Sequence, residues 1–204
     1  MSENGTEIYV NVGSVTFLNG SLTIKFEPNE KKIMEQGLIN SFSLLKQDQL
    51  KGPNDVTLVV QGKEFGFNKA CLAKISSMFK DWFESCSSDK KIPVKNDVTT
   101  VQTMETFQKI LVKKSVEPQE ITVDLYKFAN FYDIQPLVKF CGEHLGSKIN
   151  KENVFEIALA ADLVNDKGLL KEAAQFLTLN PGDYKKNFLK NNPECVVKLF
   201  QSLD

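Results

Sequence analysis

Apolar and polar positions alternate over the first thirty residues. The apolar residues recur at almost every second position on both sides of Asn19-Gly20, at Ile8, Val10, Val12, Val15, Phe17, Leu22, Ile24 and Phe26. Period-two spacing around Asn-Gly predicts an antiparallel hairpin, because both residues tolerate the positive φ of a type I′ turn. We expect a short β meander of two or three strands over residues 1–30. It is too small to bury a core alone, so it must pack on the rest of the chain or on a second copy.

The pattern then changes to a helical period. Met34, Leu38, Phe42 and Leu45 follow one another at spacings of four, four and three within residues 29–51. This spacing predicts an amphipathic helix with a broad apolar face. Such a face needs a large partner surface, which a second copy of the chain could supply.

Residues 55–83 combine both periods. The run Val56–Val60 predicts a strand covered on both faces, and Gln61-Gly62-Lys63 a tight turn into a second short strand. Asn68 is expected to cap a helix through Ala73, and Ser76 or Ser77 to cap one through Phe83. In that second helix we expect Phe83 to be buried and Trp82 to be partly exposed.

The remainder of the chain is expected to be mainly helical. A short edge strand at 92–94 and a helix over 101–113 precede a region, from about Ile121 onward, with the apolar stripe Leu125, Phe128, Ala129 and Tyr132. Asp166 is expected to cap a helix over 169–177. The predicted fold class is α+β, with a short sheet flanked by helices and then an all-helical extension.

Composition restricts the kinds of partner. The 204 residues are 42% apolar, the formal net charge is −1, and all 25 basic residues are lysine. Without arginine there is no bidentate guanidinium contact to guanine or phosphate, so the sequence argues against nucleic acid as a partner. The balanced charge likewise argues against binding to an anionic membrane. MSENGTEIYV lacks the pattern of a secretory signal, and we expect an intracellular protein, nuclear or cytoplasmic.

The sequence gives little support for catalysis or metal binding. Cys141 and His144 stand three residues apart, as two metal ligands could, but a closed zinc site needs four ligands and Cys71, Cys86 and Cys195 are scattered. His144 is the single histidine of the chain. We therefore expect a buried Cys141 and a partly exposed His144, no metal or cofactor, no catalytic residue, and a protein that is not an enzyme.

The segment DVTLVVQGKEFGFNKACLAKISSMF (55–79) resembles the signature of the BTB (POZ) family. The matching positions are Asp55, Val60, Gly62, Phe65, Lys69, Leu72, Ala73, Ser76 and Phe79, while Asn68 stands where the family usually has His. Residues 125–145 are similar to the closing BTB helices, 150–177 to a BACK-type helical extension, and 191–204 to its end in MATH–BTB adaptors of the speckle-type POZ class. The resemblance divides the chain into a β meander (1–30), a BTB/POZ domain (31–147) and a BACK-like extension (148–204).

The resemblance implies an assembly function. BTB domains homodimerise through their first helix and strand, which agrees with the need of the leading helix for a partner surface. On this basis the dimer interface would contain Met34, Leu38, Phe42, Leu45, Asp55 and Lys69. For Asp55 and Lys69, the alternative is a solvated charge at the start of an element.

Many family members also dock a cullin scaffold as substrate adaptors of cullin-RING ubiquitin ligases. Their docking loop carries a hydrophobic-x-Glu motif, whose positions correspond here to Ser87 and Asp89, so a small polar residue replaces the apolar anchor. Loss of a buried aliphatic anchor costs about 2 kcal/mol or more. Trp82 and Phe83, followed by Glu84, fit the motif earlier in the chain.

Two functions remain open from these residues. One is a homodimeric cullin adaptor, and the other is a dimeric scaffold that recruits protein clients without a cullin. The leading meander either packs locally or offers an edge strand to a client by β-augmentation.

Overall fold

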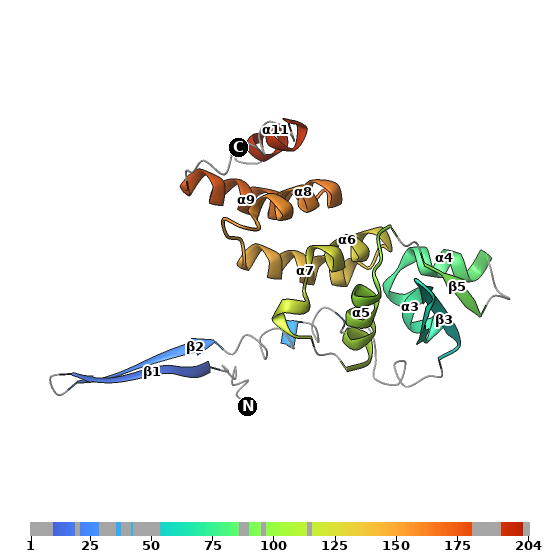
Figure 1. Cartoon of the computed structure of the whole chain (residues 1–204), viewed down its shortest axis with the longest axis horizontal. Helices are drawn as coiled ribbons and strands as arrows, with labels where there is room; N and C mark the ends of the chain where they lie inside the picture. Colours follow the sequence, from blue (N-terminus) through green and yellow to red (C-terminus); the bar gives the residue numbers. More distant parts are fainter. Residues whose placement is uncertain are drawn as a thin grey trace, which may run out of the picture.

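The fold is mixed α+β, as predicted, with a small sheet and a series of helices (Figure 1). The computed structural model of the chain describes residues 10–18, 21–28, 36–37, 42, 54–85, 90–94, 97–113, 116–180 and 193–201. The elements are β1 (Val10–Leu18), β2 (Ser21–Pro28), β3 (Val56–Val60), β4 (Lys63–Phe67), α3 (Lys69–Ile75), α4 (Ser77–Ser85), β5 (Lys91–Pro93), α5 (Val101–Lys113), η1 (Pro118–Glu120), α6 (Val123–Phe131), α7 (Gln135–Ser147), α8 (Val154–Val164), α9 (Lys167–Leu179) and α11 (Pro193–Gln201). Over these ranges, no helix is both long enough and apolar enough to cross a membrane.

The main sheet has the strand order β4-β3-β5, with β4 antiparallel and β5 parallel to the central strand. Gln61 and Gly62 connect β3 to β4 with φ values of 49° and 82°. Positive φ at both loop residues is what a type I′ hairpin requires. Along β3, Val56, Leu58 and Val60 are buried, whereas the alternate residues are only partly buried. The second face of β3 is therefore less covered than its sequence predicted.

Helices α3 and α4 begin at side-chain caps that the sequence predicted. The Asn68 side-chain oxygen accepts from the backbone N–H of Cys71 at 3.0 Å, and the Ser76 hydroxyl accepts from that of Phe79 at 3.0 Å. Each cap satisfies an N–H group that has no partner within the helix. The helices continue to Ile75 and Ser85, somewhat further than expected.

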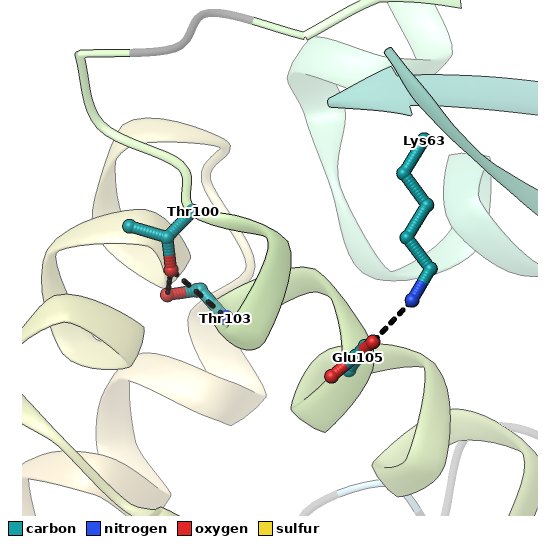
Figure 2. A network of polar contacts seen from close by, with 4 residues as sticks. All are labelled: Lys63, Thr100, Thr103 and Glu105. Atoms are coloured by element: carbon teal, nitrogen blue, oxygen red, sulfur yellow. Dashed lines mark hydrogen bonds and ion pairs between the residues drawn. The ribbon is translucent and has the colours of Figure 1, made fainter. Parts of the chain in front are cut away.

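Helix α5 is joined to the sheet by an ion pair (Figure 2) and by the contact of the Phe67 and Phe107 rings. Its first turn is capped by Thr100, whose hydroxyl accepts from the backbone N–H of Thr103 at 3.1 Å. Lys63 at the start of β4 forms an ion pair with Glu105 on the exposed side of the helix. Exposed pairs of this kind contribute little, so the buried contact of α5 with β4 has the larger part in positioning this helix.

The later helices pack as the sequence predicted. The stripe of Leu125, Phe128, Ala129 and Tyr132 is buried in the core. Helix α6 contacts α7 and α8, and α9 contacts α7, α8 and α11. In Figure 1 the helices α8, α9 and α11 lie together beyond α6 and α7.

One polar contact joins α6 to the first turn of α9. The Tyr126 hydroxyl donates to Asp166 Oδ2 at 2.9 Å, and Asp166 Oδ1 accepts from the backbone N–H of Leu169 at 3.0 Å, which confirms the predicted cap. Desolvation, followed by this hydrogen bond, raises the pKa of Tyr126, so its hydroxyl remains the donor. A Cβ at Gly142 would lie 3.0 Å from Asp166 Oδ2, so the absence of a side chain allows α7 to approach this contact closely.

Strands β1 and β2 form a separate antiparallel ladder in which Leu18 pairs with Ser21. This register leaves only residues 19 and 20 between the strands, as a two-residue hairpin requires; these two residues lie outside the described part of the chain. The register shifts between Val12 and Ser14, at the point where the apolar alternation changes parity. The irregularity keeps apolar residues opposite one another, in the pairs Val10–Pro28, Val12–Phe26, Val15–Ile24 and Phe17–Leu22. In Figure 1 the ladder extends away from the helices.

Candidate protein-binding groove

An apolar groove lies between α4, β5 and the end of α6. Its volume is about 510 Å³, and the residues that line it are Met78, Trp82, Pro93, Val94, Phe131 and Tyr132. Met78 is 38% exposed, and Trp82 and Phe131 are partly buried. Because its residues come from three separate segments, the groove exists only in the folded chain.

Stacked aromatic rings support the lining of the groove, with Phe79 packed behind Trp82 and Tyr132. Phe79 is fully buried, and its ring is nearly parallel to those of Trp82 and Tyr132, with interplanar angles of 10° and 6°. The centroid of the Phe79 ring is 6.3 Å from that of Trp82 and 5.2 Å from that of Tyr132. Phe131 meets Tyr132 edge-on at 4.9 Å. These distances are typical of favourable aromatic pairs, so the groove is preformed.

The ring contacts continue from the groove to the sheet. Tyr132 contacts Phe128 at 5.0 Å between centroids, Phe128 contacts Phe107 at 5.1 Å, and Phe107 contacts Phe67 at 5.6 Å. We call this series the aromatic chain; its members are Phe67, Phe107, Phe128, Tyr132, Phe79 and Trp82. It links β4, α5, α6 and α4 through side chains that are all buried except that of Trp82.

Hydrogen bonds fix the start of α4 against the turn after α6. The buried Ser76 hydroxyl donates to the carbonyl oxygen of Tyr132, and the Ser77 hydroxyl donates to the carboxylate of Asp133. The Gln135 amide also donates to Asp133, at 2.6 Å. These donors, Ser77 foremost, lower the pKa of Asp133, so its carboxylate stays ionised in the contact. Two sides of the groove are therefore held together by polar contacts as well as by the rings.

Of the four predicted cullin-docking residues, the structure places Trp82 in the groove. Phe83, predicted to be buried, is only partly buried; its ring stacks on Phe79 at 6.0 Å, and the ammonium group of Lys69 lies 5.6 Å from its centroid. Phe79 is the fully buried aromatic residue of α4 instead. Ser87 and Asp89 lie outside the described residues.

Sequence reasoning missed the other residues of the groove. Met78 stands four positions before Trp82 on α4, and this spacing places both on one side of the helix. Together with Phe79, which follows Met78 directly, this spacing could have indicated that α4 has an apolar outer face as well as an apolar inner one. Phe131 and Pro93 carry no comparable signal, because only tertiary packing brings them beside α4.

Three of the six predicted dimer-interface residues, Asp55, Lys69 and Phe42, make contacts within the single chain. The Asp55 carboxylate accepts from the backbone N–H of Lys69 at 2.7 Å and so satisfies another donor at the start of α3. Phe42 is 3% exposed and belongs to the core of its own chain, which leaves almost no side-chain surface for a second copy. Met34, Leu38 and Leu45 lie outside the described residues.

The remaining candidates for chemistry are Cys141 and His144 on α7. Cys141 is fully buried, and burial raises the pKa of its thiol, so the group packs as a small apolar side chain. His144 is partly exposed. Among the residues that the structure describes, no group of three or more His, Cys, Asp or Glu side chains is placed to hold a metal ion.

Comparison with known proteins gives the family. The BTB/POZ domain model matches residues 44–149, just over half of the chain. Human Kelch repeat and BTB domain-containing protein 2 is 30% identical over 145 residues, which are 69% of this chain and 22% of that protein. The Pongo abelii protein of the same name is 30% identical over 157 residues, or 73% of this chain and 24% of that protein.

A mouse relative, TD and POZ domain-containing protein 1, is 25% identical over 158 residues, which are 73% of this chain and 43% of that protein. The chain thus spans less than half the length of these relatives. The solved BTB domain of human Gigaxonin aligns with a TM-score of 0.39 and 18% identity over 60% of this chain and 96% of that one. On the family-model match, which covers the sheet and the helices through α7, the chain belongs to the BTB/POZ domain family.

Proposed function

We propose that the chain is a protein–protein interaction module whose groove binds a cullin scaffold, and that it acts as a substrate adaptor of a cullin-RING ubiquitin ligase. The observation that supports this proposal is the preformed apolar groove with the exposed Met78 and the partly buried Trp82 and Phe131. Membership of the BTB/POZ family supports an interaction function, and the resemblance implies the cullin as partner.

The chemistry of the groove favours a protein side chain as ligand. All six lining residues are apolar or aromatic, and none of them carries a charge. Concave sites of this volume with aromatic walls are typical of binding sites, and aromatic residues often dominate the energy of protein interfaces. In this proposal Met78 and Trp82 supply the apolar contact that Ser87 cannot make.

The test uses the fact that Trp82 is the single tryptophan of the chain. Protein labelled with 5-fluorotryptophan gives one fluorine resonance, which reports the groove directly. We expect a saturable shift or broadening of this resonance on titration with a purified cullin N-terminal domain. Met78→Ser should weaken binding about tenfold, because it removes an apolar contact worth about 1.5 kcal/mol.

Leu179→Ser is the matched control, because Leu179 is 79% exposed on α9, outside the groove. It should bind the cullin domain as the wild type does. A resonance that stays unchanged at tens of micromolar cullin domain would contradict cullin docking at this site.

The second candidate is a dimeric scaffold that recruits clients without a cullin. The helical spacing of the apolar residues Met34, Leu38 and Leu45 supports this scaffold, together with the dimerisation that the family resemblance implies. Phe42→Asp would disrupt the core of one chain, so Leu38→Asp is the better test. We expect light scattering to give twice the 23.0 kDa mass of one chain for the wild type and a lower mass for Leu38→Asp with an unchanged circular dichroism spectrum.

A further inference from the structure

A second cavity lies at the other end of the helical region, between the α8–α9 turn and α11. Its volume is about 490 Å³, and its walls include Ala161, Leu170, Lys167, Lys171, Lys198 and Gln201. We call it the C-terminal cavity. It shares no residue with the groove between α4, β5 and α6.

The carboxylates beside the C-terminal cavity already have partners. Both oxygens of Asp166 are hydrogen-bonded, one to the Tyr126 hydroxyl and one to the first turn of α9. Asp162 accepts from the Lys198 ammonium at 2.6 Å, and this hydrogen bond raises the pKa of Lys198 and keeps it charged. The Asp162–Lys198 pair is therefore neutral as a whole, whereas Asp166 has only neutral donors and keeps its negative charge.

The lysines of α9 are different. Lys167 and Lys171 are exposed and, in the described part of the chain, form no ion pair. They stand four residues apart in the first two turns of α9, so they lie on the same side of that helix. The positive end of the helix dipole adds to their field. Ala161 and Leu170 supply an apolar wall beside them.

We propose that the C-terminal cavity binds an acidic segment of a partner protein. An Asp or Glu side chain of the segment lies between Lys167 and Lys171, and a neighbouring apolar side chain packs on Ala161 and Leu170. Charge complementarity selects this occupant, because the Lys198–Asp162 pair is neutral and the two exposed lysines, Lys167 and Lys171, outweigh the single remaining carboxylate of Asp166. A nucleic acid fits less well, since the site has three lysines, two aspartates and no guanidinium fork.

The experiment uses two synthetic peptides and the ¹⁵N-labelled chain of 204 residues. One peptide is acetyl-Asp-Leu-Glu-Leu-Asp-amide, and the other replaces each acid with its amide counterpart. We expect the acidic peptide to shift the backbone resonances of Gly168, Lys171 and Gln201 in a saturable way. The fluorine resonance of Trp82 should stay in place, which separates this site from the groove of the proposed function.

Charge-inverting variants locate the contact. Lys167→Glu with Lys171→Glu should weaken binding of the acidic peptide at least tenfold, because two attractive charges are replaced by two repulsive ones. Lys139→Glu with Lys151→Glu makes the same change in net charge at exposed residues outside the cavity and should leave the affinity unchanged. Lys167→Gln with Lys171→Gln replaces the inverted pair if that variant does not fold.

Several results would overturn the proposal. These are equal shifts by the two peptides, no shift by either peptide, or equal weakening by the control variant. A lower mass of the Lys167→Glu, Lys171→Glu protein in light scattering would also overturn it, because the occupant would then be a second copy of the chain.

Discussion

Replacement of Phe79 by alanine tests whether the aromatic chain holds the groove together. The side chain is fully buried and stacks on Trp82, Phe83 and Tyr132. Truncation of a buried Phe to Ala costs about 3–5 kcal/mol, and each aromatic pair contributes about 0.5–1.5 kcal/mol beyond its buried area. Because alanine cannot stack on any of these neighbouring rings, we expect Phe79→Ala to lose about 4 kcal/mol or more of the free energy of unfolding.

The loss is a large part of the roughly 5–15 kcal/mol that stabilises a typical domain. Phe79→Leu is the milder variant, because it keeps most of the volume and removes the stacking; it should lose about 1.5 kcal/mol. Both are measured by urea unfolding followed by far-ultraviolet circular dichroism. The emission of Trp82 in the native state should shift to longer wavelength in the alanine variant, because its ring loses the stacked neighbour.

Leu179→Ala is the control for this series. Its side chain is 79% exposed, so the change should stay within about 0.5 kcal/mol. A loss below about 1 kcal/mol for Phe79→Ala, with unchanged Trp82 emission, would refute the assignment of Phe79 as the ring that supports Trp82 and Tyr132.

Two further variants test polar contacts. Tyr126→Phe should lose about 1–2 kcal/mol of the free energy of unfolding, because it leaves an Asp166 oxygen without its donor. The pKa of Tyr126 is raised in the folded chain, so the wild type loses this residue's contribution to stability as the pH rises above about 10. The urea midpoint of the variant should therefore decline less steeply from pH 8 to pH 10.5 than that of the wild type. Equal declines would contradict that reasoning. Asp55→Ala should lose about 1 kcal/mol of the free energy of unfolding, because the Lys69 N–H no longer has its acceptor, while Asp55→Asn keeps an acceptor and most of the stability. A change of oligomeric mass with an unchanged free energy of unfolding would instead favour an interface role for Asp55.

The parts of the fold that depend on near neighbours were predictable from the sequence. The caps at Asn68, Ser76 and Asp166 each join a side chain to an amide three residues later, and such contacts depend little on the rest of the fold. The hairpin around Asn19-Gly20 was predictable in the same way, apart from the extra residue near Gly13 that adjusts its register.

The groove could not be predicted because it depends on how distant segments pack. The apolar character of Phe42 predicted that it would be covered, but not whether its own chain or a second copy would cover it. Likewise Phe83 follows Phe79 by one helical turn, yet only the position of α4 at the edge of the fold decides that the second ring is partly exposed. The sequence predicts that an apolar side chain will be buried, but only the tertiary structure shows which residues cover it.

The aromatic chain restricts how this surface could change over evolutionary time. Each ring between Phe67 and Trp82 is a neighbour of the next, so a smaller side chain at Phe128 or Phe107 would disturb the groove and the sheet together. Met78 is free of that restriction, because it is 38% exposed and stands outside the ring series. New partner preferences would therefore arise at the rim of the groove far more readily than beneath it.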